Sequence, residues 1–476
     1  MPRPTGRRSS ARFLFICCSS PSRRRSRSAS PDKRYPQHER RSGVRKASGK
    51  PFAPETRSWL SAVIPPWTAL PFVVLVLSMA SLPLTVPHFW ERRSFQALVV
   101  AACALPISWF LWSHGEGHAL LHSVSGYITF IVTLGALYVA AGGVYAHADL
   151  RATPVVNACF LLVGSVLASI IGTTGASVLL IRPLLRTNRQ RQHTAHIVPF
   201  FILAAANAGG LLTPLGDPPL LVGFVNGVPF FWTLNLLPIW FLYNSFFALL
   251  LYVVDKRAYA RESQEALVRD EREQQPITIK GKHNLLLLGA VIGAAFLPAV
   301  WREACLIGII LVSFFATPKE VHQLNGFSFA PIAEVALLFI GLFVCLVPIE
   351  GMLSEMAGHL PVQGSYQLFW ASGLLSAVLD NAPTYAAFAA LAKGLSHGQP
   401  DLVAGIAPIK LMAISAGSVI MGATTYIGNG PNLMVKSIAE RAGVPMPSFT
   451  RYAIFAFFTM LPAHAVVTVA FIFIDR

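Results

Sequence analysis

Charged residues are scarce in this chain. They form 13% of its 476 residues, whereas hydrophobic residues form 54%, and the mean hydropathy is +0.55. A soluble enzyme with a large core does not have this composition, which is typical of a protein that crosses a membrane many times. Apolar runs long enough for a ~30 Å hydrocarbon layer recur from about residue 60 to the end of the sequence. We therefore expect the lipid bilayer to surround most of the chain.

Motifs of catalytic and ATP-driven proteins are also missing. The sequence contains no Walker loop and no recognisable pairing of a nucleophile with a base, and its six cysteines lack the spacing of metal ligands. These absences argue against an enzyme and against an ATP-driven pump. We expect no enzymatic activity and no cofactor apart from transported ions, with transport driven by ion gradients.

The net charge of +16 is misleading because the basic excess is local. Residues 1–58 hold 16 Lys and Arg against three acidic residues, which leaves +3 for the rest of the chain. This Arg-, Ser- and Pro-rich tail cannot bury enough apolar surface to fold, so we predict that it is disordered. A transit peptide and a nucleic-acid-binding arm are alternatives. A solvated tail or an extension from an upstream start codon is favoured, and we expect no nucleic-acid partner.

One stretch interrupts the apolar pattern near the middle of the chain. Residues 204–212 are typical of a membrane helix, but residues 213–219 read Thr-Pro-Leu-Gly-Asp-Pro-Pro, and the apolar run resumes at Leu220. Unwound backbone at membrane depth is tolerated only where it is buried in protein or lines a wet cavity. Many transporters build their central site from such a discontinuous helix.

The same break occurs a second time, 212 residues later. Asp217 then aligns with Asn429, and the aligned segments share six identical pairs: Ala204/Ala416, Gly210/Gly422, Thr213/Thr425, Gly216/Gly428, Pro219/Pro431 and Leu221/Leu433. Repetition at a fixed spacing indicates an internal duplication. A coincidence between two Gly- and Ala-rich helices is the less favoured alternative.

Each half also contains a pair of short apolar segments around a polar tip. In the first half, Gly172-Thr173-Thr174-Gly175 divides residues 154–187, and the piece after it is too short to span a bilayer. In the second half, Asp380-Asn381-Ala382-Pro383 divides residues 368–391 in the same way. Two half-depth segments that meet at a polar tip indicate a re-entrant hairpin.

Together these patterns predict an all-α polytopic membrane protein built from two inverted repeats. Each repeat would have three spanning helices, a re-entrant hairpin, a broken helix and a closing helix. The predicted parts are a disordered basic tail at 1–58, a first transmembrane repeat at 59–257, a polar connector at 258–283 and a second transmembrane repeat at 284–476. The predicted spans outside the hairpins and breaks are 61–86, 95–113, 120–144, 232–254, 284–300, 303–317, 332–349 and 451–474.

The basic loops give an orientation. The positive-inside rule places the loop that contains Arg182, Arg186, Arg189 and Arg191 in the cytoplasm. The first hairpin then opens to the cytoplasm and the second to the exterior, as inverted repeats require. We expect a multi-pass protein of the bacterial inner membrane.

At the hairpin tips and the first break, the chain resembles the ion transporter superfamily. Within it, the sequence is most similar to D-type sodium/proton antiporters and to the citrate transporter branch. The motifs that carry the resemblance are Gly172-Thr173-Thr174-Gly175-Ala176-Ser177, Asn207 to Pro219, and Leu379-Asp380-Asn381-Ala382-Pro383-Thr384. The resemblance implies a homodimer in which a mobile transport domain makes elevator-like movements against a scaffold. It departs from the antiporter pattern at Thr173-Thr174, where those antiporters often have Asp-Asn.

The predicted ion- or substrate-binding residues come from the two tips and the two breaks. They are Thr173, Thr174, Asn207, Thr213, Gly216, Asp217, Asp380, Asn381, Thr384, Thr425, Gly428 and Asn429. Hard monovalent cations prefer oxygen ligands such as carboxylates, hydroxyls, amide oxygens and free carbonyls. Asp217 and Asp380 are the two acids at broken positions, so they are the candidate sodium ligands.

Two aspartates in the site favour a cation over an anion. Desolvated carboxylates also suit competition between a cation and a proton. We therefore predict a sodium/proton antiporter. The alternative is a citrate or dicarboxylate transporter coupled to cations, because half-helix N-termini and neutral donors can hold an anionic substrate. A non-transporting membrane scaffold is the alternative from another class, and it has no need for duplicated broken helices.

Overall fold

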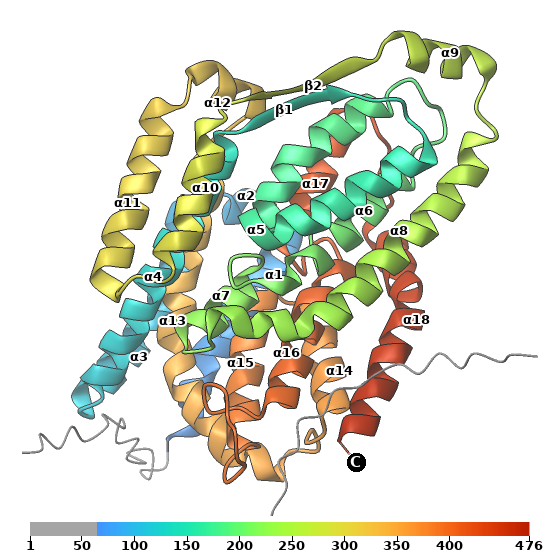
Figure 1. Cartoon of the computed structure of the whole chain (residues 1–476). Coiled ribbons are helices and arrows are strands. Elements are labelled where there is room, and N and C mark those ends of the chain that lie inside the picture. Colours follow the sequence, from blue (N-terminus) through green and yellow to red (C-terminus); the bar gives the residue numbers. More distant parts are fainter. Residues whose placement is uncertain (1–63, 476) are drawn as a thin grey trace, which may run out of the picture. The chain divides into compact units, whose positions relative to one another are not determined.

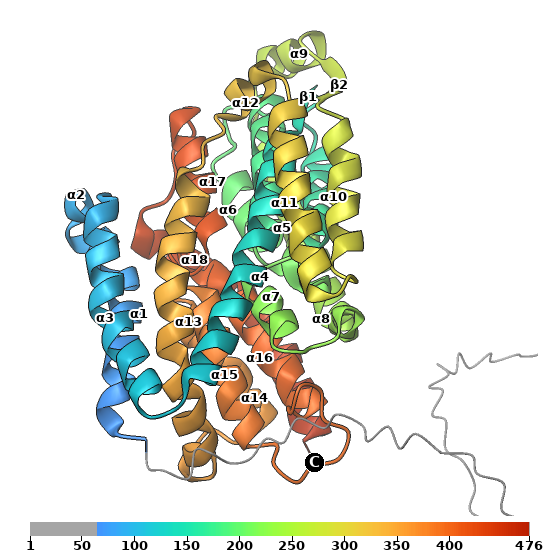
Figure 2. The same ribbon diagram turned by 90° about the vertical axis from the view of Figure 1, so that its left-hand side faces the viewer.

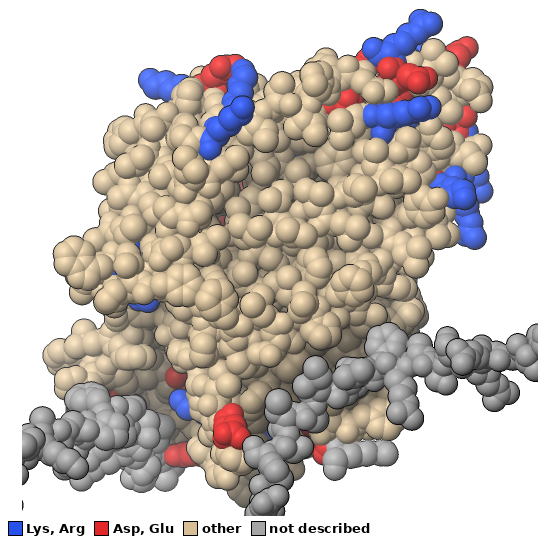
Figure 3. All heavy atoms as spheres, viewed as in Figure 1, with Lys and Arg blue, Asp and Glu red and all other residues tan. Residues whose placement is uncertain are grey.

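The computed structural model describes residues 64–475, so the basic tail predicted at 1–58 lies outside the described part of the chain. Within residues 64–475, eight helices are long and apolar enough to cross a membrane. On the face drawn in Figure 3, the Lys, Arg, Asp and Glu side chains gather at two opposite ends, and the broad band between them carries almost none. These observations confirm the predicted all-α polytopic membrane fold.

The first half of the described chain contains the predicted spans, hairpin and broken helix in order (Figure 1). Its elements are η2 (Pro66–Thr68), α1 (Ala69–Thr85), α2 (Pro87–Trp90), α3 (Arg93–Ser113), α4 (Gly117–Gly142), β1 (Tyr145–Asp149), α5 (Pro154–Thr187), α6 (Ile197–Ala204), η3 (Ala208–Leu212), α7 (Pro218–Val225), η4 (Phe230–Leu236) and α8 (Leu237–Tyr259). A connector with α9 (Gln264–Arg272) and β2 (Gln275–Lys280) follows. The two strands form an antiparallel pair in which Tyr145 lies opposite Lys280.

The second half repeats this order. Its elements are α10 (His283–Ala294), α11 (Ala299–Ala316), α12 (Lys319–Asn325), α13 (Ala330–Met356), η5 (Ala357–His359), α14 (Ser365–Ser376), α15 (Asn381–Gly394), α16 (Pro408–Met421), η6 (Gly422–Thr424), α17 (Gly430–Arg441) and α18 (Phe449–Ile474). One predicted span differs. Residues 284–300 do not form one helix, because α10 ends at Ala294 and Pro298 is the N-cap of α11. With 12 residues, α10 is only about 18 Å long.

Outside the hairpins and breaks, one long helix of each half packs against the first helices of the other half. In the second half, α13 packs against α1 and α3 of the first half, whereas its counterpart in the first half, α4, packs against α10 and α11. The two long helices also pack on each other, and Figure 2 shows α13 and α4 between α3 on one side and α11 on the other. Each repeat therefore contributes one long helix to the helix group of the other repeat, as a pseudo-twofold relation between the repeats requires.

The first hairpin is the helix α5, which reverses direction at Gly172. This residue has φ 81° and ψ 152°, a backbone conformation that glycine adopts at no steric cost. The two arms run side by side, because Asn157 Nδ2 donates to Asn188 Oδ1 at 3.0 Å although the residues are 31 positions apart. The second arm begins directly at Thr173 and is longer than the sequence suggested, since only one residue leaves the helical conformation.

The second hairpin consists of α14 and α15, which pack against each other. Asp380 is the N-cap residue of α15, and Asn381 is the first residue of the helix. All eight residues of α6 are buried, and so are ten of the 14 residues of α16. Helices that are buried on all sides are apolar on all sides, which explains the uniform runs that precede both breaks.

Candidate functional site

The two predicted breaks have the same backbone conformation. Thr213 and Asp217 in the first break are extended, with φ/ψ of −136°/157° and −150°/146°. Thr425 and Asn429 in the second break have −131°/167° and −154°/137°. The breaks occupy residues 213–217 and 425–429, and Pro218 already begins α7, because proline is tolerated in the first turn of a helix. The discontinuous helices predicted from the sequence are therefore present at both positions.

Each break is closed by a contact between two glycines of the duplicated motif. A Cβ atom added to Gly428 would lie 2.5 Å from the carbonyl oxygen of Gly422 and 2.7 Å from that of Ser376. In the first half, Gly216 approaches the carbonyl of Gly210 in the same way. The identity of these pairs in the sequence thus has a steric cause, since only glycine fits where the backbone folds onto itself.

We expect Gly428→Ala to lower the free energy of unfolding by about 1–3 kcal/mol, because the backbone must shift to admit the methyl group. Gly430→Ala is the matched control, since no atom lies within 4 Å of a Cβ added there. Thermal unfolding of the detergent-purified variants measures the difference. Equal stability of the two variants would contradict the close-packed break.

Asp217 lies where both hairpin tips and both breaks meet. Its side chain is buried, with 2% of its surface exposed. Thr173 Oγ1 donates to Asp217 Oδ1 at 2.6 Å, Asn381 Nδ2 donates to Oδ2 at 2.5 Å, and Asn429 Nδ2 donates to Oδ1 at 3.1 Å. Among the ion pairs of residues 64–475, none involves Asp217. The structure therefore brings Thr173, Asp217, Asn381 and Asn429 together around one carboxylate.

Asn207 extends this group through a second set of amides. Its Oδ1 accepts from Asn429 Nδ2 at 3.1 Å, and its Nδ2 donates to Asn432 Oδ1 at 2.6 Å. Asn432 was not among the residues predicted from the sequence. The 212-residue shift aligns it with Leu220, so a search for matched polar pairs passes over it. Its position in the first turn after the second break was the available signal.

The other predicted threonines are hydrogen-bonded to the backbone. Thr213 Oγ1 donates to the carbonyl of Ser169 at 2.5 Å, and Thr425 Oγ1 donates to that of Ala377 at 2.6 Å. Each break is thereby attached to the first arm of the hairpin in its own half. Thr384 Oγ1 donates to the carbonyl of Asp380 at 3.0 Å. Each of these hydroxyl groups donates its proton to a backbone carbonyl, so the three threonines hold the hairpins and breaks in place.

The remaining predicted residues are sequence neighbours of the central group. The carbonyl of Gly216 accepts from the backbone amide of Thr173 at 2.8 Å, which fixes the first tip to the first break. Thr174 and Asp380 are half-buried. The Asp380 carboxylate adjoins the backbone amides of Asn381 and Ala382 at the start of α15 and does not hydrogen-bond to Asp217.

Asn381 has a further property that bears on ligand binding. Its Nδ2 is used by Asp217, but its Oδ1 is buried and has no hydrogen-bond partner among the described residues. An unpaired buried oxygen is costly unless a ligand or water meets it. The two Asp217 oxygens and this amide oxygen are ligands of the kind that a hard monovalent cation prefers.

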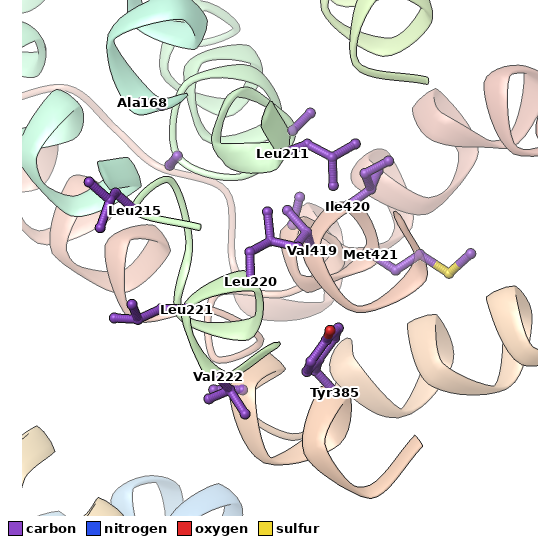
Figure 4. Close-up of a cluster of buried hydrophobic side chains, with 14 of the residues drawn as sticks. Ala168, Leu211, Leu215, Leu220, Leu221, Val222, Tyr385, Val419, Ile420 and Met421 are labelled. Atoms are coloured by element: carbon purple, nitrogen blue, oxygen red, sulfur yellow. The ribbon is translucent and has the colours of Figure 1, made fainter. Parts of the chain in front are cut away.

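An apolar cluster lies on the helices next to this centre, since α7 begins directly after Asp217 and α15 begins at Asn381. Figure 4 shows Leu220, Leu221 and Val222 of α7 together with Tyr385 of α15 and Val419 of α16 in one buried group. These helices pack against one another. Such a group excludes water, which strengthens electrostatic interactions at the neighbouring carboxylate.

The chain is similar to several known membrane proteins. A family model described as putative citrate transport matches residues 61–473. A 46 kDa membrane protein of Mycobacterium leprae is 25% identical over 301 residues, which cover 58% of this chain and 68% of that protein. An uncharacterized transporter of Mycobacterium tuberculosis is 26% identical over 337 residues, which cover 65% of this chain and 75% of that protein.

Proposed function

Because the chain belongs to the putative citrate transport family, we propose that it is a secondary active transporter that exchanges a monovalent cation for a proton at Asp217. Sodium is the first candidate for the cation. The observation that carries the proposal is a buried carboxylate with neutral hydrogen-bond donors and no basic partner among the described residues. Intramembrane acids of this kind are functional candidates by default.

Cation and proton would compete for the same oxygens. A cation at the centre would be held by Asp217, by the free Oδ1 of Asn381 and by backbone carbonyls of the breaks, with Asp380 adding negative charge nearby. A proton on Asp217 would remove the charge that holds the cation. The occupied states are thereby mutually exclusive, which is the requirement for exchange.

The movement that carries the site across the bilayer would involve two groups of helices. The hairpins and broken helices are joined to one another through Asp217 and the breaks, and the closing helices α8 and α18 pack against them, whereas α4 and α13 join α1, α3, α10 and α11. We propose that the first group moves as a transport domain against the second, in a homodimer of the bacterial inner membrane. The names of the family and of the relatives argue against a non-transporting scaffold.

Citrate transport coupled to cations is the second candidate. It is favoured by the family description and by one feature of the site, the convergence of three neutral donors on a carboxylate. A substrate carboxylate that displaced Asp217 from these groups would meet the hydroxyl and the two amide donors that it needs.

The proposal is tested in everted membrane vesicles that contain the overproduced protein. Sodium, lithium, potassium and citrate are added one at a time, citrate is also added together with each cation, and proton movement is followed with a pH-sensitive fluorescent dye. Antiport predicts proton release from vesicles on addition of a cation alone. A response to citrate added together with a cation, with none to any cation added without citrate, would contradict the antiporter and support the second candidate.

Asp380→Asn separates the two candidates. For an antiporter we expect exchange to fall about tenfold, because one of the two acids near the cation is neutralised. For a citrate transporter, removal of negative charge from the site preserves or strengthens citrate uptake. The measurements are cation-dependent proton movement and uptake of labelled citrate by the same vesicles. Unchanged exchange in this variant would show that Asp380 takes no part in cation binding.

A further inference from the structure

Four side chains form a continuous chain of hydrogen bonds from Asp217 to the second break. Asn429 Nδ2 donates to Asp217 Oδ1 and to Asn207 Oδ1, both at 3.1 Å. Asn207 Nδ2 donates to Asn432 Oδ1 at 2.6 Å. Asn432 Nδ2 then donates to the carbonyls of Gly422 and Thr425, each at 2.9 Å. All four side chains are buried, with at most 2% of their surface exposed.

The surroundings of Asn432, the last member of this chain, determine which way the Asn432 amide faces. The only groups beside Asn432 Nδ2 in this chain of bonds are two carbonyl oxygens, which accept and cannot donate. The NH2 group of Asn432 must therefore face Gly422 and Thr425, so its oxygen faces Asn207. A reversed amide would place an oxygen against two carbonyls and an NH2 against the NH2 of Asn207.

The orientation is passed from one amide to the next. Since Asn432 presents an oxygen, Asn207 must present its NH2 to it, and the same NH2 also donates to the carbonyl of Ile202 at 2.9 Å. Asn207 then presents its own oxygen to Asn429. Asn429 therefore presents its NH2, which also donates to the carbonyl of Ala206 at 3.2 Å and to Asp217. The carboxylate thus receives a donor and never the amide oxygen of Asn429.

The two repeats differ at this pair. The 212-residue shift aligns Asn207 with Val419 and Asn432 with Leu220, and both of those residues belong to the buried apolar cluster in Figure 4. The Asn207–Asn432 pair lies where α6 and α17 pack together, whereas the apolar pair belongs to α7 and α16, which also pack together. The site is therefore polar at the crossing of α6 with α17 and apolar at the matching crossing of α7 with α16.

We propose that Asn432 is a positioning residue, which together with the carbonyl of Ile202 holds the amide of Asn207 and, through it, the donor that Asn429 presents to Asp217. The inference rests on the proposed role of Asp217 as the group that binds the cation and the proton. Without Asn432, the Asn207 NH2 keeps only the carbonyl of Ile202 as an acceptor, so the Asn207 amide and the Asn429 amide bonded to it are held less firmly. Asp217 then loses one of its three donors for part of the time, and the ionised carboxylate loses stabilisation relative to the protonated one.

The test compares Asn432→Ala with Asn432→Asp in the everted-vesicle assay, with the full pH profile and the KM for the cation as readouts. A protonated carboxyl group at 432 keeps an oxygen for Asn207 Nδ2 and an O–H for the carbonyls of Gly422 and Thr425, so it preserves the orientation that alanine loses. For Asn432→Ala we expect the half-maximal pH of exchange to rise by about one unit and the KM to change about tenfold, the effect of one hydrogen bond to a charged group. For Asn432→Asp we expect values closer to those of the parent.

Asn244→Ala is the matched control for the loss of a buried asparagine. Asn244 accepts from Ser165 Oγ and donates to the carbonyl of Trp240, and none of its hydrogen bonds leads to Asp217. We expect this variant to change stability but not the half-maximal pH. An unchanged pH profile in Asn432→Ala, or equal shifts in Asn432→Ala and Asn244→Ala, would overturn the positioning role. That result leaves the proposed function standing, whereas retained exchange in a variant with a neutral residue 217 would refute the proposed function itself.

Discussion

Asp217→Asn is expected to abolish cation-dependent proton movement, with a loss of more than about 100-fold, since the variant loses both the charge that holds the cation and the group that takes up the proton. A neutral amide cannot alternate between ionised and protonated forms at any physiological pH. The effect should therefore be a loss of maximal rate at every cation concentration and every pH. A weakened KM alone is not expected.

The protein should nevertheless fold, because its partners can adapt to the amide. Thr173 and Asn429 both donate to Oδ1 of residue 217, which an asparagine retains. The NH2 group of the new side chain would meet Asn381 Nδ2, but Asn381 can turn its amide and present the Oδ1 that has no partner in the parent protein. One neutral hydrogen bond then replaces a charged one, at a cost of about 1 kcal/mol.

Two measurements check these expectations. Exchange by the purified variant in proteoliposomes tests the loss of transport, and thermal unfolding in detergent tests whether the variant folds. Asp401→Asn is the matched control, since Asp401 is an exposed acid and its neutralisation should leave exchange unchanged. Exchange that persists in Asp217→Asn would refute the antiporter. Citrate uptake that persists in Asp217→Asn, with no cation-dependent proton movement in the parent, would favour the citrate transporter.

The breaks and tips could be found from the sequence because their causes are local. Proline and glycine stop a helix wherever they stand, and the duplication showed the same interruption twice. The contact between Gly428 and the carbonyl of Gly422 spans only six positions. Such features depend on residue type and short spacing, which the sequence displays directly.

The division of roles among the site residues could not be found in this way. Asp380 and Asn381 are neighbours in the sequence, and the tip motif treats them alike. In the structure, Asn381 begins α15 and donates to Asp217, which is 164 positions away, whereas Asp380 is half-buried at the N-cap. The difference depends on how the first turn of α15 is placed relative to the first break, which carries Asp217. This is a tertiary property that the spacing of a motif does not encode.

Arg191 shows the same limit. The sequence marked it as one of several basic residues of a cytoplasmic loop, equivalent to Arg189. In the structure, Arg189 is an exposed partner of Glu273, whereas the Arg191 side chain is fully buried between Asp255 and Glu262. Charge counting assigns the same weight to both residues, but their surroundings give them very different contributions to stability.

Arg191→Leu is expected to lower the free energy of unfolding by about 3–5 kcal/mol, because it leaves two buried carboxylates without their cation. Arg191 makes two hydrogen bonds to Asp255, Nη1 to Oδ2 at 3.0 Å and Nη2 to Oδ1 at 2.6 Å, and its Nε lies 3.4 Å from Glu262 Oε1. Arg189→Leu is the matched control and should cost about 0–1 kcal/mol, since exposed ion pairs contribute little. Equal unfolding temperatures of the two variants would show that the buried network does not stabilise the fold.

The pH dependence of unfolding gives a second, independent check on this network. Burial raises the pKa of Glu262, but the backbone amides of Gln192 and His193 and the Arg191 guanidinium together lower it below the usual value of 4.5. A carboxyl group whose pKa is depressed by folding stabilises the protein fully above its unfolded pKa and loses that contribution as the pH falls through the folded pKa. The parent protein should therefore lose stability below about pH 4.5, whereas Glu262→Gln should be less stable at neutral pH and lose less on acidification. If both proteins lose the same stability between neutral pH and pH 3, the Glu262 carboxylate is not stabilised by its partners in the folded state.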